Sequence, residues 1–308
     1  MKRLVILNPH SRHGTAGLRF AKERDRWQRE LGGFDVRETR HPGHATELVR
    51  DALQGGGVDQ LLVAGGDGTI HEALCGYWSD EVEAPPPVPL GILNLGTGGD
   101  LYRTVTAASG DYRDALINNR SRLIDVGTVR ADAGPSVPFL NLASVGMAGA
   151  MLRSLKASSF QSGSAAYFYH TIKTLFRFHP VWVRASWNGP AGVEDAFEGP
   201  LYNLFACNGR FSGGGMEWAP TARLDSGVLV FTLVTGTRRW PLVRHSGLVY
   251  RGRIAEFPGA ITVTATSLTV RAASPLSLET DGEIGDLPGG GAPEFTFDVH
   301  PRVFPLVL

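Results

Sequence analysis

Residues Val63–Glu72 read VAGGDGTIHE, which places a glycine-rich turn between an apolar run and a helical pattern. Glycine lets the backbone come close to a ligand, and free N–H groups at a helix N-terminus favour a phosphate. The stretch lacks the Gly-Lys-Ser/Thr ending of a Walker A loop. A dinucleotide-binding fingerprint does not fit either, because the negative charge of Asp67 would lie where the pyrophosphate of a dinucleotide binds. A carboxylate there suits a metal or a proton transfer; the alternative interpretation is a tight turn in which Asp67 caps the helix.

Two more polar turns follow short apolar runs in the same part of the chain. Asn8–Gly14 (NPHSRHG) follows Leu4–Leu7, and Leu95–Asp100 (LGTGGD) follows Leu90–Leu93. Turns at the carboxyl ends of parallel strands line a common crevice. Three such turns are stronger evidence for a phosphate site than any one of them.

The alternation of strand and helix patterns up to residue 123 predicts a doubly wound α/β domain with a parallel sheet. Beyond residue 124, short strands between turn residues, some with period-two alternation as in Ile261–Thr264, predict a mainly antiparallel β domain. We therefore expect two domains, 1–123 and 124–299, with the apolar segment 300–308 returning to the first.

Bulk composition excludes several classes of protein. Lys+Arg and Asp+Glu both number 30, so there is no basic excess of the kind that binds nucleic acid. Cys75 and Cys207, the only cysteines, form no CxxC pair, so a disulfide framework is not expected. No apolar run approaches the length of about 20 residues that spans a membrane, and the N-terminal run is too short for a signal peptide. We expect a cytoplasmic protein.

Motifs along nearly the whole chain resemble, in order, those of the diacylglycerol kinase catalytic-domain superfamily, which includes bacterial lipid kinases, sphingosine kinases and ceramide kinases. In the first domain these are Asn8-Pro9, Thr39 before His44-Ala45, Gly65–Thr69 with Glu72, and Gly96–Asp100. In the second they are Asn141–Gly146, Asn208–Met216 with Ala219-Pro220 and Ala222, and Asp281-Gly282-Glu283.

The resemblance implies a first domain like those of NAD kinase and phosphofructokinase, a second, β-sandwich domain that shapes a lipid site, and an active site in the cleft between them. It implies transfer of the γ-phosphoryl group of ATP to a lipid hydroxyl, with Mg²⁺. The implied ATP contacts are Asn8, Pro9, His10, Ser11, Arg12, Thr39, Gly65, Gly66, Asp67, Gly68, Thr69, Glu72, Gly96, Thr97, Asp281 and Gly282. The implied substrate contacts are Asp100, Asn208, Gly213, Gly214 and Met216.

Phosphoryl transfer to a hydroxyl needs a base and charge neutralisation. Our hypothesis makes Glu283 the general base and Asp67 the metal-linked or proton-relay group; the two can exchange roles. Three departures from the family pattern bear on the site. Gly99 and His71 stand where Asn is usual, and Ser226-Gly227 stands where Asp-Gly binds an auxiliary Mg²⁺, with Asp225 as the replacement ligand.

Alternatives remain open. One is an NAD kinase-like enzyme, and another is a nucleotide- or lipid-binding regulatory protein that has lost catalysis. His41 and His44 have metal-ligand spacing, but we identify no third ligand. Met147–Pro180 is basic and apolar, which fits either transient contact with the inner membrane surface or a core helix. Diacylglycerol, a sphingoid base, ceramide and phosphatidylglycerol-like head groups all fit as substrates, and free sheet edges would allow a homodimer.

Overall fold

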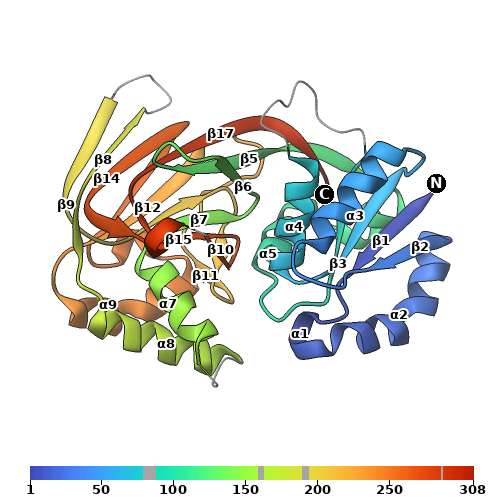
Figure 1. Cartoon of the computed structure of the whole chain (residues 1–308), viewed down its shortest axis with the longest axis horizontal. Helices are drawn as coiled ribbons and strands as arrows, with labels where there is room; N and C mark the ends of the chain where they lie inside the picture. The colour runs from blue at the N-terminus through green and yellow to red at the C-terminus, as the bar shows by residue number, and fades with distance from the viewer. Residues whose placement is uncertain (79–87, 159–162, 189–193, 286) are drawn as a thin grey trace. The chain divides into compact units, whose positions relative to one another are not determined.

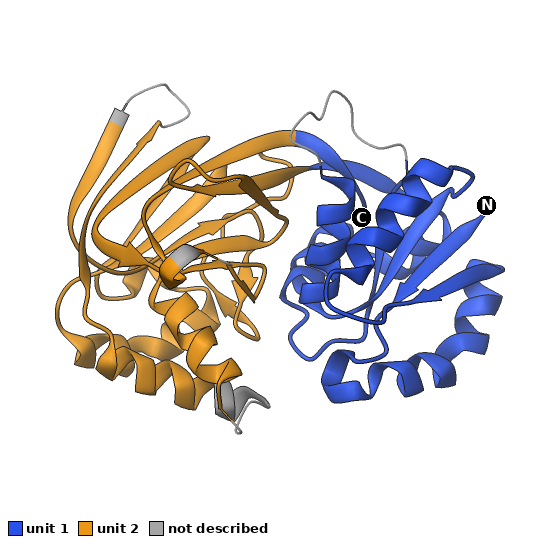
Figure 2. Cartoon of the chain, in the orientation of Figure 1, with its two compact units in different colours: residues 1–124, 302–308 blue, residues 125–301 orange. Residues whose placement is uncertain are grey.

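The computed structural model describes residues 1–78, 88–158, 163–188, 194–285 and 287–308. It divides into two compact units, one of residues 1–124 with 302–308 and one of residues 125–301 (Figure 2). We call them unit 1 and unit 2. Their use as nucleotide and lipid domains stays a prediction.

Unit 1 is built on a parallel sheet whose strands are ordered β4-β3-β1-β2 (Figure 1). The strands are β1 (Arg3–Leu7), β2 (Phe34–Glu38), β3 (Gln60–Gly65) and β4 (Leu90–Asn94). Every residue of β1 and β3 is buried, as expected for strands covered on both faces. At the outer side of β4, Leu306 of β17 (Ala292–Val307) pairs in parallel with Leu90.

The helices of unit 1 connect successive strands. They are α1 (Ser11–Gly14), α2 (Ala16–Leu31), α3 (His44–Gly55), α4 (Asp67–Tyr77), α5 (Asp100–Ser109) and α6 (Tyr112–Ile117). Right-handed crossovers place α2 on one face of the sheet and α3 and α4 on the other, because the strand order reverses after β2. The reversal puts the loops after β1 and β3 next to each other.

Unit 2 is mainly antiparallel. Its strands include β7 (Leu142–Gly146), β8 (Val181–Asn188), β9 (Glu194–Cys207), β12 (Leu229–Thr235), β13 (Ala260–Ala265), β14 (Ser267–Leu276), β15 (Leu278–Thr280) and most of β17. The main path is β16-β15-β7-β9-β8-β14-β17, with β12 and β13 continuing from β9. β16 is Glu283–Ile284, and β5 (Ser121–Ala131, which begins in unit 1) pairs with β17 and with β6 (Ser136–Phe139). β10 (Phe211–Ser212) and β11 (Met216–Glu217) form a separate two-stranded sheet.

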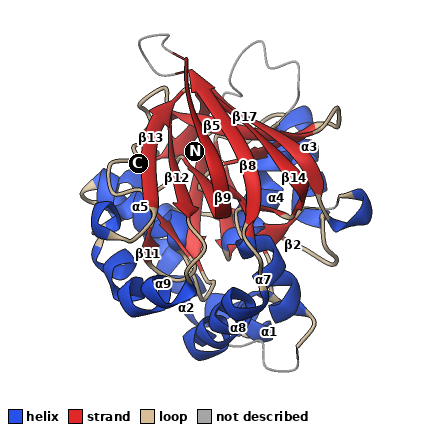
Figure 3. Cartoon of the chain, turned by 90° about the vertical axis from the view of Figure 1, so that its left-hand side faces the viewer, coloured by secondary structure: helices blue, strands red, loops and turns tan. Residues whose placement is uncertain are grey.

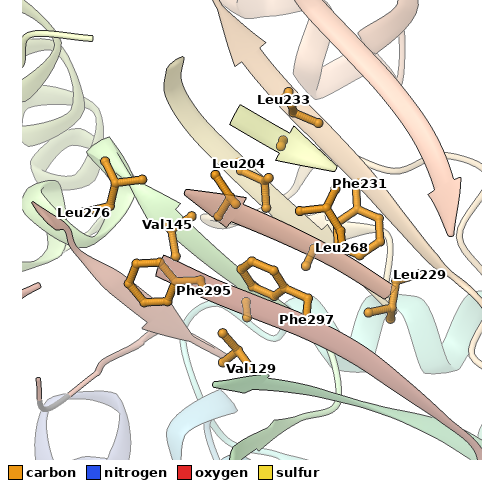
Figure 4. Packing of buried hydrophobic residues seen from close by; sticks show 14 of the residues in the cluster. Val129, Val145, Leu204, Leu229, Phe231, Leu233, Leu268, Leu276, Phe295 and Phe297 are labelled. Atoms are coloured by element: carbon orange, nitrogen blue, oxygen red, sulfur yellow. The ribbon is translucent and has the colours of Figure 1, made fainter. Parts of the chain in front are cut away.

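The strands of unit 2 enclose a core of large side chains that includes Phe231, Phe295 and Phe297 (Figure 4). A second buried cluster lies beneath the helices and includes Tyr202, Phe205 and Leu242. The helices are α7 (Met147–Lys156), α8 (Gly163–Arg177) and α9 (Arg239–His245), with short 3₁₀ turns η1 (Ser246–Arg251), η2 (Ile254–Glu256) and η3 (Pro288–Gly290). Figure 3 shows these helices gathered at one side of the strands. No helix in the described part of the chain is long and apolar enough to cross a membrane.

The predicted fold class, a parallel α/β domain followed by an antiparallel β domain, is confirmed. Two local patterns are broken in the structure. The apolar run around residues 139–145 is divided between β6 and β7 at Leu140-Asn141. The helix that begins at Arg239 ends at His245 and continues as η1, which contains Gly247, a residue that weakens helices.

Candidate active site

The turns that follow β1 and β3 are joined by polar contacts to Thr69. The Asn8 amide Nδ2 donates to Thr69 Oγ1 at 3.0 Å, and Ser11 Oγ lies 3.4 Å from the same oxygen. The third turn is reached from Arg12, whose Nη1 donates to the Gly96 carbonyl at 3.4 Å. The structure thus brings the three predicted phosphate-binding turns together at one edge of the sheet.

The turns approach so closely that two positions exclude any side chain. A Cβ on Gly96 would lie 2.6 Å from the Gly66 Cα, and a Cβ on Gly65 would lie 2.6 Å from Thr69 Oγ1. The contact at Gly96 is with backbone atoms, which cannot move away as a flexible side chain can. Glycine at these two positions therefore lets the turns pack directly against each other and against Thr69.

Asp67 is the first residue of α4, but it does not cap that helix. The N-cap of α4 is Gly66, without a side-chain hydrogen bond. The Asp67 Oδ2 instead accepts hydrogen bonds from the backbone N–H groups of Gly99 (2.9 Å) and Asp100 (3.4 Å), at the start of α5. The interpretation of Asp67 as a cap of its own helix is therefore wrong, and its carboxylate links the second turn to the third.

The neighbouring motif residues hold the backbone in place. Glu72 Oε2 accepts from the Ala45 N–H at 3.1 Å, and the Glu72 carbonyl accepts from Thr46 Oγ1, so Glu72 anchors the start of α3. Thr39 is buried and its N–H donates to the Leu7 carbonyl. Asp100 is buried and forms an ion pair with Arg103 at 2.7 Å.

The departure at position 99 has a structural counterpart. Gly99 has φ 63°, and a Cβ there would lie 2.5 Å from Asn94 Nδ2. Asn94 Oδ1 in turn accepts from the Gly96 N–H at 3.1 Å. An amide group therefore lies at this turn although the family's Asn is missing, because Asn94 provides it from the preceding strand.

A cavity of about 560 Å³ borders the third turn from within unit 1. Its wall contains Gly96–Gly99 and several arginines: Arg12, Arg19, Arg26, Arg103 and Arg113. Several of these are paired, Arg19 and Arg26 with Glu23 and Arg113 with Glu30. Apart from Arg12, sequence reasoning missed these side chains, which come from α2, α5 and α6; the spacing of Arg19 and Arg26 on one face of α2 is the signal that was available.

In unit 2, the side chains of Asp281 and Asn208 bind backbone groups of distant segments of the chain. Asp281 is buried with φ 49°, and its carboxylate accepts from the N–H groups of Leu140, Asn141 and Leu142 at 2.9–3.1 Å. Asn208 is fully buried, and its Nδ2 donates to the carbonyls of Asp125 and Leu140. Both side chains are thus committed to backbone groups, which gives these two predicted ligand contacts a structural role.

The other predicted residues of unit 2 are more accessible. Glu283 lies in β16, is 46% exposed, and forms an ion pair with Lys156 at 2.7 Å. Gly282, Gly213 and Gly214 have positive φ values of 86°, 62° and 82° at turns.

A separate apolar pocket of about 110 Å³ lies within unit 2, between the helices and the strands. Met216, a predicted substrate contact, lines it together with Met151, Leu175 and Trp218. Of its described lining residues, only Glu279 is acidic or basic; Glu279 is 5% exposed and accepts from Ser144 Oγ at 2.6 Å. Nearby, burial and then the Glu279 charge raise the pKa of the Cys207 thiol, so this cysteine stays protonated at neutral pH.

The candidate metal ligands differ in their surroundings. Asp225 Oδ1 accepts from Arg223, at 3.3 Å to Nη2, and the loop is held by Asp125, whose Oδ2 accepts from the Gly227 N–H. At the start of α3, Glu47 joins His41 and His44, with ligand atoms within 4.8 Å of one another. The statement that these histidines lack a third ligand is therefore wrong. His44 Nδ1 accepts from the Arg40 N–H at 3.0 Å and the two rings stack, so Nε2 is the ring nitrogen of His44 that is left for a metal.

Comparison with known proteins matches both units to family models. Residues 2–129 match the diacylglycerol kinase catalytic domain, and residues 141–308 match the YegS C-terminal NAD kinase beta sandwich-like domain. A protein of Xanthomonas axonopodis pv. citri described as "Probable lipid kinase YegS-like" is 30% identical over 254 residues, which covers 81% of this chain and 80% of that protein.

A "Diacylglycerol kinase" of Mycobacterium tuberculosis is 25% identical over 288 residues, covering 91% of this chain and 87% of that protein. The crystal structure of a diacylglycerol kinase from Bacillus anthracis superposes with a TM-score of 0.66 and 18% identity, covering 99% of this chain and 96% of that chain. The structural likeness shows a shared fold over the whole chain.

Proposed function

This chain belongs to the family of YegS-like lipid kinases and diacylglycerol kinases, and we propose that it transfers the γ-phosphoryl group of ATP to a hydroxyl group of a lipid. The observation that carries the ATP half of the proposal is the meeting of three turns at Thr69 and Gly96. Two of those turns pack so closely that only glycine fits at Gly65 and Gly96. The arginines of the adjoining cavity add positive charge beside it.

We propose that a magnesium-bound nucleotide is held at Asp67 rather than an auxiliary metal at Asp225. Mg²⁺ prefers oxygen ligands and usually keeps several waters, so it is bound through one or two carboxylates and the substrate phosphates. The Asp67 carboxylate lies at the glycine turns, where the phosphates would bind. Asp225 would have to leave its ion pair with Arg223 before it could bind a metal. When bound, Mg²⁺ neutralises the charge that spreads over the transferred group.

The lipid half of the proposal rests on the pocket of unit 2. Its walls are mostly apolar, as is typical of sites for hydrophobic ligands. A cavity of about 150 Å³ accepts a molecule the size of benzene. The pocket of about 110 Å³ would therefore hold a short part of an alkyl chain, and the remainder would extend beyond its mouth.

The proposed base is Glu283, the more exposed of the two candidate carboxylates. A positioned base contributes about 10²–10⁴-fold in rate. Glu283→Gln should lower kcat by that factor with an unchanged Tm, because an exposed ion pair stabilises a protein by only about 0–1 kcal/mol. Lys156→Ala breaks the same ion pair but leaves the carboxylate, so it separates loss of the pair from loss of the base. If the two variants lose activity equally, Glu283 is not the base.

The direct test is transfer of label from [γ-³²P]ATP to an extract of total bacterial lipids, resolved by chromatography. A labelled lipid that is absent with Asp67→Ala, and present with the half-buried carboxylate control Asp225→Ala, supports the proposal. A parallel reaction with NAD tests the alternative of an NAD kinase-like enzyme. Formation of NADP would show that NAD, and not a lipid, is the substrate. Absence of label in every lipid, with Mg²⁺ present, contradicts the proposal.

A further inference from the structure

Exposed aromatic side chains gather on α8, α9 and η1. Large apolar side chains are usually buried, and contiguous exposed ones mark an interaction surface. The set is Trp240 (71% exposed), Phe168 (53%), Tyr169 (52%), Tyr250 (52%) and Phe176 (41%). The rings of Phe176 and Trp240 are 5.4 Å apart, which joins α8 to α9 in one patch (Figure 1). We call these five residues the aromatic patch.

The two chain segments that form the aromatic patch carry basic residues and no acidic ones. Neither residues 163–180 nor residues 237–255 contain Asp or Glu. The same segments carry exposed Arg177, Arg238, Arg244 and Arg251, and Lys173 Nζ lies 5.8 Å from the Tyr169 ring. Over the whole chain the charges balance, so this local excess is not a consequence of composition.

The aromatic patch borders the apolar pocket. Phe168 and Tyr250 belong to the patch and also line the pocket. Val243 and Ser246, which lie between Trp240 and Tyr250 in the chain, line it as well. The pocket therefore opens on the surface where the exposed rings and the arginines are.

We propose that α8, α9 and η1 form a docking surface for an anionic lipid bilayer, with the mouth of the pocket facing the membrane. Aromatic rings such as Trp and Tyr favour the level of the lipid head groups, and nearby Lys and Arg are attracted by anionic lipids. A soluble protein partner would also cover the rings, but the Arg and Lys side chains of these segments outnumber the neighbouring carboxylates of Glu217 and Glu256, which are paired with Arg210 and Arg253, and so favour anionic head groups. That the docked pocket takes its lipid from the bilayer rests on the proposed function; docking itself does not.

Docking is tested by sedimentation of the full chain with vesicles of phosphatidylcholine alone or mixed with phosphatidylglycerol. Binding is expected only to the mixed vesicles and should weaken as salt is raised. Trp240→Ala and Arg244→Glu, which do not line the pocket, should each weaken binding about tenfold. The matched controls are Trp182→Ala and Arg184→Glu on β8, exposed residues of the same unit, which should bind as the wild type does.

Equal binding to both kinds of vesicle, or unaltered binding by both test variants, overturns the proposal. Sedimentation velocity without vesicles tests a second copy of the chain as the occupant: a dimer that Trp240→Ala dissociates would also overturn it. Kinase activity toward lipid in detergent micelles separates the two proposals. Vesicle binding without activity toward any lipid contradicts the proposed function alone, whereas micellar activity without vesicle binding contradicts docking alone.

Discussion

The Asp67 carboxylate accepts a hydrogen bond from the backbone N–H of Gly99 at 2.9 Å, and so the two glycine-rich turns of unit 1 are fixed to each other. The same oxygen faces the Asp100 N–H at the start of α5, where the helix dipole favours a negative charge. One side chain thus serves the local structure and stands where the proposed chemistry needs a carboxylate.

Replacing Asp67 should separate these two roles. Asp67→Asn keeps an oxygen that can accept from Gly99, so Tm should fall little, whereas kcat should fall about 10²–10⁴-fold because the charge is lost. Asp67→Ala removes both the accepting oxygen and the charge. It should therefore lower kcat and also lower the free energy of unfolding by about 1–3 kcal/mol. Urea unfolding and the ATP transfer assay measure the two effects. Wild-type kcat in Asp67→Asn would leave Asp67 with a structural role only.

The contact between Gly96 and Gly66 predicts a backbone shift in Gly96→Ala. The new Cβ would lie 2.6 Å from the Gly66 Cα, so the turns must move apart and the KM for ATP should rise at least tenfold. Gly55→Ala is the control, because its Cβ would meet nothing within 4 Å and Gly55 ends a helix. Equal KM values in the two variants would show that the turns tolerate the added carbon.

The pair of Asn94 and Gly99 predicts that two substitutions compensate. Gly99→Asn alone places its Cβ 2.5 Å from Asn94 Nδ2 and should cost about 1–3 kcal/mol in unfolding free energy. Adding Asn94→Gly makes room and transfers the amide to position 99, so the double variant should regain much of that loss. A double-mutant cycle in urea measures the coupling. Strict additivity of the two losses is the contrary result.

Asp281 should be among the residues that matter most for the stability of unit 2. Its carboxylate accepts from three backbone N–H groups, and Asp281→Ala would leave these buried donors without that acceptor, at a cost of about 1–3 kcal/mol. Asp225→Ala, at an exposed loop, should change stability by no more than about 0.5 kcal/mol. Thermal unfolding compares them. A small loss at Asp281 would mean that solvent replaces the carboxylate there.

Local signals in the sequence suffice for the fold and for the three turns. Apolar runs that end in glycine or polar residues predict β1, β3 and β4, because a strand covered on both faces has to be apolar throughout. The contact between Asp67 and Gly99 spans 32 residues and arises only when β3 and β4 pair, so no local pattern predicts it. Likewise, the arginine-lined cavity is assembled from separate helices. Glu47, by contrast, follows His44 by three positions on a helix and was available from spacing alone.

The last strand contributes to both units, since β17 runs through unit 2 before Leu306 pairs with Leu90. Dividing the chain at one position therefore cannot separate unit 1 from unit 2 with both complete. A fragment that stops at residue 124 would leave β4 as a bare edge, open to pairing with other chains and to aggregation. An isolated unit 1 would need residues 302–308 joined after Ile124, and during synthesis on the ribosome its sheet is complete only once β17 has emerged.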